Sequence, residues 1–130
     1  GIVLGAPVHY ASAAGQASCA YDRLFVMSNG AFANKLGAAV VSCRRGGATA
    51  TFDQLNKYFT ISNMPVVSSN YWNTVHGNTP EEVAQDIEGL QTMRILGRNM
   101  PWLLKCIEAG KQAGINPPAF EARTNTNFIR

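Results

Sequence analysis

The chain has 130 residues, a length that favours one domain large enough to bury most of its apolar surface around a single core. Apolar residues make up 46% of it and charged residues 15%, which excludes a disordered chain, and no apolar run approaches the roughly 18 residues of a membrane span. The net charge of +3 comes from cations that are scattered except at Arg44-Arg45, so neither nucleic acid nor a membrane is expected as a partner.

The three cysteines, Cys19, Cys43 and Cys106, are odd in number and far apart in the sequence. Their spacing fits neither a disulfide framework nor a metal-binding pair, and it predicts reduced thiols in a cytoplasmic protein without a metal site. The chain begins at Gly1 with no initiator Met and no signal peptide, so we interpret it as part of something longer.

The first third of the chain predicts a strand, a loop and a helix. Residues 1–5 form a short apolar run between glycines, which is typical of a buried parallel strand. Residues 6–12 are predicted as a loop, because Pro7 has no N–H to donate. Apolar residues at three- and four-residue spacings then indicate a helix over residues 15–27, ended by Ser28-Asn29-Gly30.

A second strand, over residues 37–43, leads into the loop Arg44-Arg45-Gly46-Gly47 and then into a helix with Phe52, Leu55 and Phe59 on one face. Two adjacent glycines allow backbone N–H groups to approach a ligand closely, and the first helical turn offers unpaired donors and a partial positive charge. An electron-rich ligand would suit this loop. The alternative is an ordinary connection whose glycines only relieve backbone strain.

A third strand is predicted over residues 64–70, with Pro65 at its start. The loop that follows, residues 71–78, is rich in aromatic and amide groups. It can be interpreted either as a cap over a planar ligand or as a packed surface loop.

The remaining chain predicts helix and then tail. Thr79 and Pro80 match a helix start, and residues beyond Asp86 continue as one long amphipathic helix, which Pro101 should kink near Arg98. Its apolar face is formed by Met93, Leu96, Met100, Leu103 and Ile107. Apolar residues on other faces, Ile95, Trp102 and Leu104, predict a homodimer or homotetramer.

The order β-α-β-α-β-α predicts an α/β fold, the carboxyl half of a doubly wound parallel sheet, over residues 1–114, with an extended tail over 115–130. Ligands of such sheets bind beyond the carboxyl ends of the strands. Three loops lie there. The loop over residues 7–15 is small and flat, the loop over residues 42–47 is glycine-rich with two cations, and the loop over residues 71–78 is aromatic. A planar anionic cofactor fits this combination best.

Catalytic side chains are scarce. His9 and His76 stand 67 positions apart, each in a predicted loop, and neither belongs to a metal-binding motif. Cys43 lies where a helix start and Arg44 can lower a thiol pKa, but a small buried residue at the end of a strand is the favoured alternative.

Three stretches carry a resemblance to a known family: residues 1–16 (GIVLGAPVHYASAAGQ), 21–25 (YDRLF) and 37–49 (GAAVVSCRRGGAT). They resemble the NADPH-dependent FMN reductases, flavodoxin-like proteins, in the branch that includes the iron-sulfur flavoproteins. The resemblance implies that FMN lies against Pro7, Val8, His9, Tyr10, Ser12, Gly15, Ser42, Cys43, Arg44, Arg45, Gly46 and Gly47. It also implies that the family's first two strands, its FMN-phosphate loop and its cysteine cluster would precede Gly1.

The function implied is that of an FMN-binding oxidoreductase, an NAD(P)H-dependent flavin or quinone-type reductase. Such an enzyme needs no side-chain acid or base, since the protein holds the flavin and tunes it electrically. The alternative is a flavodoxin-like electron carrier or binding module without its own NAD(P)H turnover.

Overall fold

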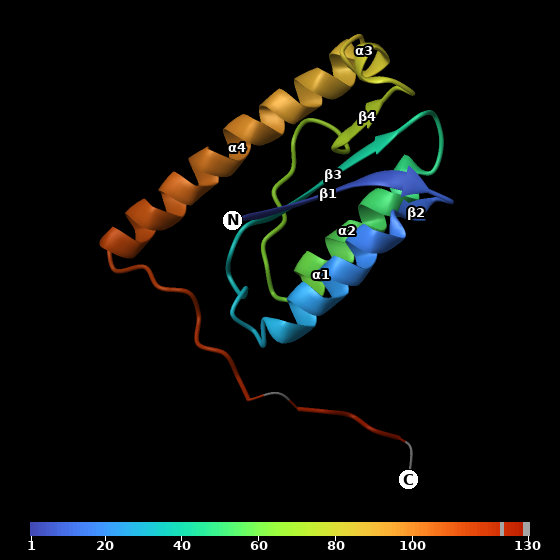
Figure 1. Ribbon diagram of the computed structural model, residues 1–130. Coiled ribbons are helices and arrows are strands. Elements are labelled where there is room, and N and C mark those ends of the chain that lie inside the picture. The colour runs from blue at the N-terminus through green and yellow to red at the C-terminus, as the bar shows by residue number, and fades with distance from the viewer. Residues whose placement is uncertain (123, 129–130) are drawn as a thin grey trace.

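The computed structural model describes residues 1–122 and 124–128, and its centre is a sheet between two helical layers (Figure 1). The strands, in the spatial order β2-β1-β3-β4, are β1 (Ile2–His9), β2 (Ser12–Ala13), β3 (Gly37–Cys43) and β4 (Thr74–His76). The helices are α1 (Gly15–Met27), α2 (Ala48–Ile61), α3 (Pro80–Val83) and α4 (Ile87–Gln112). Helices α1 and α2 cover one face of the sheet and α4 covers the other.

The three longer strands are parallel. Strand β1 pairs with β3 from Ile2 opposite Gly37 to Pro7 opposite Ser42, and β3 pairs with β4 as far as Cys43 opposite His76. The predicted α/β class with a parallel, doubly wound sheet is therefore confirmed. Because all three strands run the same way, the chain segments that follow them meet at one edge of the sheet, the carboxyl edge.

The core between the sheet and α1 and α2 is closely filled. Leu55 and Phe59 of α2 are fully buried against Leu4 and Val41 of the sheet. The ring of Phe25 lies 5.2 Å from Tyr58, 5.3 Å from Phe32 and 6.0 Å from Phe59, measured between centroids. Gly37 is required here, because a Cβ at that position would overlap the Phe59 ring.

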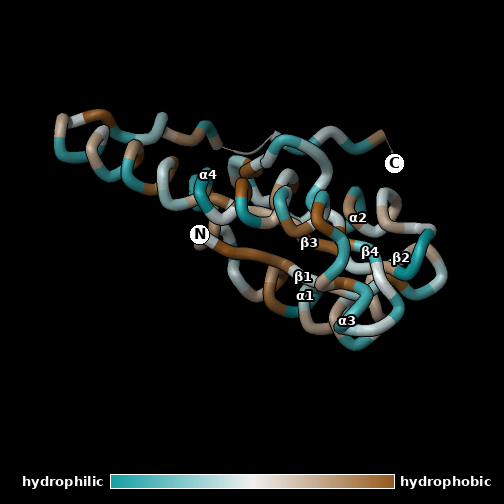
Figure 2. The backbone as a smooth tube through the Cα atoms, turned by 90° about the horizontal axis from the view of Figure 1, so that it is seen from above, coloured by the Kyte–Doolittle hydropathy of each residue, from teal (hydrophilic) through white to brown (hydrophobic). Residues whose placement is uncertain are grey.

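The core beneath α4 is smaller. Leu96 packs on Leu36, Ala38 and Val67, and partly buried side chains surround this group: Val40, Met100 and Leu103. The predicted apolar face of α4 reaches the sheet only in part, since Ile107 is 48% exposed. Figures 1 and 2 show why: the last turns of α4 extend beyond the sheet.

The prediction of a strand over residues 64–70 was wrong. In that stretch only Val66 forms a β-bridge, with Gly37, and the strand lies further along at residues 74–76. Pro65 has no N–H, although its carbonyl accepts from the Gly37 N–H. Asn73 then anchors the chain on β3: its side-chain Nδ2 donates to the Ala39 carbonyl and its own carbonyl accepts from the Val41 N–H.

The prediction of a loop over residues 6–12 was also wrong, because β1 continues to His9 and pairs with β2 through a hairpin. Pro7 is tolerated inside this strand. Its carbonyl accepts from the Ala14 N–H, on the side away from β3, so the missing N–H of Pro7 leaves no gap in the β1–β3 ladder.

The predicted helix start at Thr79 is confirmed, with the Thr79 hydroxyl accepting from the Glu82 N–H, but this helix lasts one turn. A second start follows at Asp86, whose carboxylate accepts from the Gly89 N–H. Helix α4 is continuous from Ile87 to Gln112 with Pro101 inside it, and its ribbon shows no sharp bend along its length (Figure 1), so the prediction of a kink near Arg98 was wrong. In the part of the chain that the structure describes, no helix combines the length and apolar character of a membrane span.

Candidate cofactor site

Two chain turns meet at the carboxyl edge of the sheet. One is the hairpin between β1 and β2, and the other is the loop from Arg44 to Gly47 that joins β3 to α2. Gly47 lies against Ala11 and Val8, since a Cβ at Gly47 would stand 2.9 Å from the Ala11 Cα and the Val8 Cγ1. The structure therefore brings together the two segments in which most of the predicted site residues lie.

The hairpin turn consists of two residues in the left-handed region. Tyr10 has φ 51° and Ala11 has φ 57°, with His9 and Ser12 paired on either side. Two consecutive positive φ values are typical of the type I′ turn, which usually contains Asn or Gly. Neither residue favours this conformation, and strained backbone of this kind is common at ligand sites. The Tyr10 side chain is fully exposed.

Helix α2 holds the hairpin in place. The Gln54 side-chain oxygen accepts from the Ser12 hydroxyl and from the Ala13 N–H, both at 2.8 Å. Sequence reasoning missed Gln54, because nothing in its spacing distinguishes it from other polar residues of an amphipathic helix. Ser12 thus has a structural partner, and Gly15 is the first residue of α1.

The two adjacent glycines have different roles. Gly47 has φ +84° and is the N-cap residue of α2, so both its conformation and its contact with Ala11 require glycine. Gly46 has no heavy atom within 4 Å of an added Cβ, and its backbone is not in the left-handed region. The space in front of Gly46 is open to a ligand.

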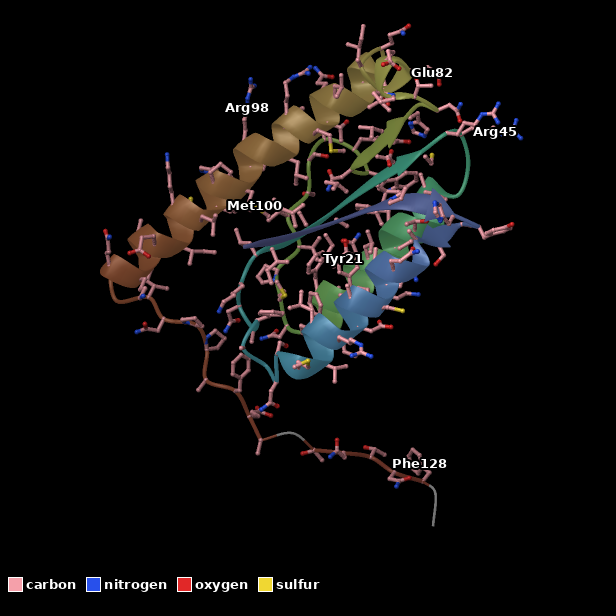
Figure 3. All side chains as sticks on the ribbon, in the orientation of Figure 1. Tyr21, Arg45, Glu82, Arg98, Met100 and Phe128 are labelled. Atoms are coloured by element: carbon pink, nitrogen blue, oxygen red, sulfur yellow. The ribbon has the colours of Figure 1, made fainter. Side chains whose placement is uncertain are left out.

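The electrostatic character of this edge is positive. Arg44 and Arg45 are exposed, and Figure 3 shows the Arg45 side chain extending away from the loop. The first turn of α2 contains no acidic residue, so the partial positive charge of the helix N-terminus is not neutralised locally. Both features favour an electron-rich ligand.

A groove of about 310 Å³ runs along the carboxyl halves of the parallel strands on the α4 side. Its walls include Pro7 of β1, Ser42 of β3, Val75 of β4 and Met93 of α4. Apolar walls beside a polar loop are typical of sites for planar cofactors.

The Cys43 thiol is a structural group. It is buried in the core beneath α2, and burial raises its pKa although the Ala48 N–H acts in the opposite direction. A protonated, buried thiol is a poor nucleophile. The strand register does place His76 beside Cys43, which the sequence did not reveal, but the His76 imidazole Nδ1 lies 3.6 Å from the Asp86 carboxylate.

The aromatic loop over residues 71–78 belongs to the same edge of the sheet but forms a separate hollow of about 260 Å³. Tyr71 and Trp72 are half-exposed, with ring centroids 5.2 Å apart, and they line this hollow with His76 and Asp86. Among the residues that the structure describes, no group of three His, Cys, Asp or Glu side chains could hold a metal ion.

The fold and this carboxyl edge define a doubly wound, flavodoxin-like protein. The sequence profile described as NADPH-dependent FMN reductase matches residues 1–79, and the chain belongs to this family. The chain is 34% identical, over 116 residues, to an iron-sulfur flavoprotein of Methanocaldococcus jannaschii, with 83% of this chain and 60% of that protein covered.

A solved structure shares the fold. It is described as the flavodoxin, WrbA-like protein from Agrobacterium tumefaciens, and it superimposes with a TM-score of 0.55 over 75% of this chain and 66% of that one. Its sequence identity is 12%, so it supports the fold alone. The chain spans 60% of the length of the curated relative that it matches.

Proposed function

We propose that this chain binds FMN at the carboxyl edge of its sheet and takes part in electron transfer from NAD(P)H to a second acceptor. The observation that carries this proposal is the open space in front of Gly46, which lies between the N-terminus of α2 and a strained hairpin with an exposed tyrosine. Family membership and the flavoprotein relative support the identity of the cofactor.

The isoalloxazine ring of FMN, when bound, supplies the hydride and electron chemistry. The residues of this chain would position the ring and stabilise negative charge on it. Backbone N–H groups at the start of α2 point out of the helix end, and Arg44 and Arg45 add positive charge on the same loop. The Tyr10 ring is free to stack on a planar ligand, and Pro7 and Ser42 form the wall of the adjoining groove.

Gly46→Val tests the placement of the ring. The new side chain has open space in the protein itself, so the fold should be retained while the ligand is displaced. We expect FMN affinity to fall at least tenfold, about 1.4 kcal/mol, as measured by fluorescence quenching. Gly97→Val on α4, where an added Cβ also meets nothing within 4 Å, is the matched control. Unchanged affinity in Gly46→Val would refute the site.

A comparison of FMN with riboflavin tests the role of the two arginines. If Arg44 and Arg45 hold the phosphate, riboflavin binds more weakly than FMN, and an Arg44→Ala, Arg45→Ala variant removes the difference. If the chain contacts only the ring, the two ligands bind equally. Calorimetry with both ligands distinguishes these results.

The second candidate is an electron carrier, which the fold supports because flavodoxin-like sheets of this topology also bind FMN without turning over a nicotinamide. A steady-state assay with NADPH, FMN and a dye acceptor separates the two functions. Turnover that is lost in Gly46→Val identifies a reductase, whereas a bound flavin that NADPH does not reduce identifies a carrier.

A further inference from the structure

A large cavity lies far from the candidate cofactor site. It has a volume of about 650 Å³ and opens between the last turns of α1 and α2. Both helices return antiparallel to the strands, so their C-terminal ends lie at the amino edge of the sheet (Figure 1). Its walls include Asp22, Phe25, Val26, Tyr58, Ile61 and Phe120. The volume falls within the range of about 300 to 1,000 Å³ that small-molecule sites occupy.

The helix ends at this cavity favour a cationic ligand. Each helix C-terminus carries a partial negative charge of about half an electron, and the last turns of α1 and α2 contain no basic residue. No Lys, Arg or His lines the cavity. The two helix ends therefore add their partial charges on the same side of the cavity, with Lys57 in an adjoining hollow and outside this one.

Asp22 adds a full carboxylate to this environment. Its Oδ1 accepts a hydrogen bond from the Tyr58 hydroxyl, and no described residue donates to its Oδ2. The only ion pair within the described residues joins His76 to Asp86, so Asp22 forms no ion pair there, although Lys57 lines an adjoining hollow with Asp22 and Tyr58. Burial, followed by the hydrogen bond to Asp22, raises the pKa of Tyr58 to about 12, which keeps the hydroxyl protonated as a donor.

Most of the remaining wall is apolar and aromatic, and Ser28, Asn29, Ser62 and Asn63 line the rest. The Phe25 and Tyr58 rings lie 5.2 Å apart, and the Phe120 ring reaches the cavity from the tail. Val26 and Ile61 at the rim are 81% and 86% exposed, a large apolar exposure for neighbouring helix ends. Aromatic faces attract cations, and apolar rims favour a ligand with a hydrocarbon body.

We propose that this cavity is a second ligand site, which binds a small organic cation consisting of a protonated amine on an aromatic or aliphatic body. The ammonium group donates to the Oδ2 of Asp22, and the body packs between Phe25, Val26 and Ile61. The site is independent of the proposed FMN function, because it lies at the opposite edge of the sheet.

The test is a titration of the ¹⁵N-labelled full chain with 2-phenylethylammonium chloride, followed by amide chemical shifts. We expect saturable shifts in the last turns of α1 and α2 with a Kd of about 1 mM or below. The neutral analogue 2-phenylethanol, which has the same body without the charge, should bind at least about tenfold more weakly.

Two variants assign the charge. Asp22→Asn keeps an oxygen for the Tyr58 hydroxyl but removes the charge, and it should weaken the cation about tenfold while leaving 2-phenylethanol unchanged. Ile61→Lys places a competing ammonium at the exposed rim and should also weaken the cation. Asp53→Asn is the matched control, because it removes one carboxylate at an exposed position of α2 that does not line the cavity.

Three results would overturn the proposal. They are equal affinity for the cation and the alcohol, an unchanged affinity in Asp22→Asn, or shifts that map to residues away from the ends of α1 and α2.

Discussion

The two faces of the sheet differ in how completely helices cover them. Adjacent residues of β1 show the difference: Leu4, which faces α1 and α2, is 2% exposed, whereas Val3, which faces the other way, is 51% exposed. Both residues suit a strand equally well by type. Burial in this protein is therefore decided by the helices, two on one face and one on the other, and not by the strand sequence.

Helix α4 covers its face of the sheet only in part, and this face includes the groove along Pro7, Ser42 and Met93. Figure 3 shows the Met100 side chain extending from α4 toward the beginning of β1. On this face of the sheet, no helix covers the outer side of β1 in the part of the chain that the structure describes (Figure 1). We propose that association with another chain covers this surface, in the homodimer or homotetramer that the sequence predicts.

The largest expected effect on stability comes from the face of the sheet that α1 and α2 cover. Phe59→Ala should lower the free energy of unfolding by about 3 to 5 kcal/mol, because the Phe59 ring is fully buried among other rings. Leu96→Ala, under α4, should cost about 2 to 3 kcal/mol, because solvent can fill part of the space it leaves. Urea unfolding measures both. Equal costs would mean that the two faces are packed alike.

The next effect concerns the attachment of α4 to the sheet. The Asp86 carboxylate caps α4 at the Gly89 N–H and also accepts from the His76 N–H of β4 at 2.7 Å. Asp86→Ala should cost about 1 to 2 kcal/mol, whereas Glu88→Ala in the same turn should cost much less.

The same residue predicts a pH dependence. The Gly89 N–H, together with His76, holds the pKa of the Asp86 carboxyl below its ordinary value. Its contribution to stability is therefore complete above the ordinary Asp pKa and is lost as the pH falls through the lowered value. Asp86→Ala should unfold with a shallower pH dependence in that acidic window. If the wild-type chain and Asp86→Ala lose the same stability as the pH falls, Asp86 is not a source of the acid sensitivity.

The smallest expected effect on unfolding tests association. Val3→Lys should change the stability of the monomer by about 0.5 kcal/mol or less, since the side chain is half in solvent. Light scattering at micromolar concentration should nevertheless show a mass reduced from the dimer or tetramer to the monomer. Ile87→Lys, an exposed position at the start of α4, is the control, and a monomeric wild-type chain would refute the association.

Sequence patterns predicted correctly those helices and strands whose residue spacing and end residues agree with the way they pack in the fold. Helix α1 and strand β3 have the predicted bounds, because spacing, strand propensity and the flanking stop residues all point the same way. The apolar run after Met64 was misleading, because it forms a single bridge and the strand lies at residues 74–76. Just before that strand, the Asn73 side chain donates to the Ala39 carbonyl of β3, a hydrogen bond that a strand backbone would otherwise supply.

The site was predictable only in part. The glycine pair predicts either a ligand loop or an ordinary connection, and the different roles of Gly46 and Gly47 depend on the contact with Ala11, which is distant in sequence. The strained turn at Tyr10 was not predictable, because its sequence, Tyr-Ala, lacks the Asn-Gly signal of such hairpins.

Before Pro7, where pairing with β2 begins, no described strand pairs with the outer edge of β1, and this affects the exchange of its amide hydrogens with solvent. The Ile2 N–H donates to the Leu36 carbonyl on the β3 side, and successive residues of a strand point alternately to either side. The amides of Leu4 and Ala6 are therefore held in the β1–β3 ladder, whereas those of Val3 and Gly5 face outward, on the side where the Tyr21 hydroxyl donates to the Gly5 carbonyl. Deuterium should enter this strand in an alternating pattern, rapid at Val3 and Gly5 and slow at their neighbours. Any chain that pairs with this edge will slow the rapid positions and remove the alternation.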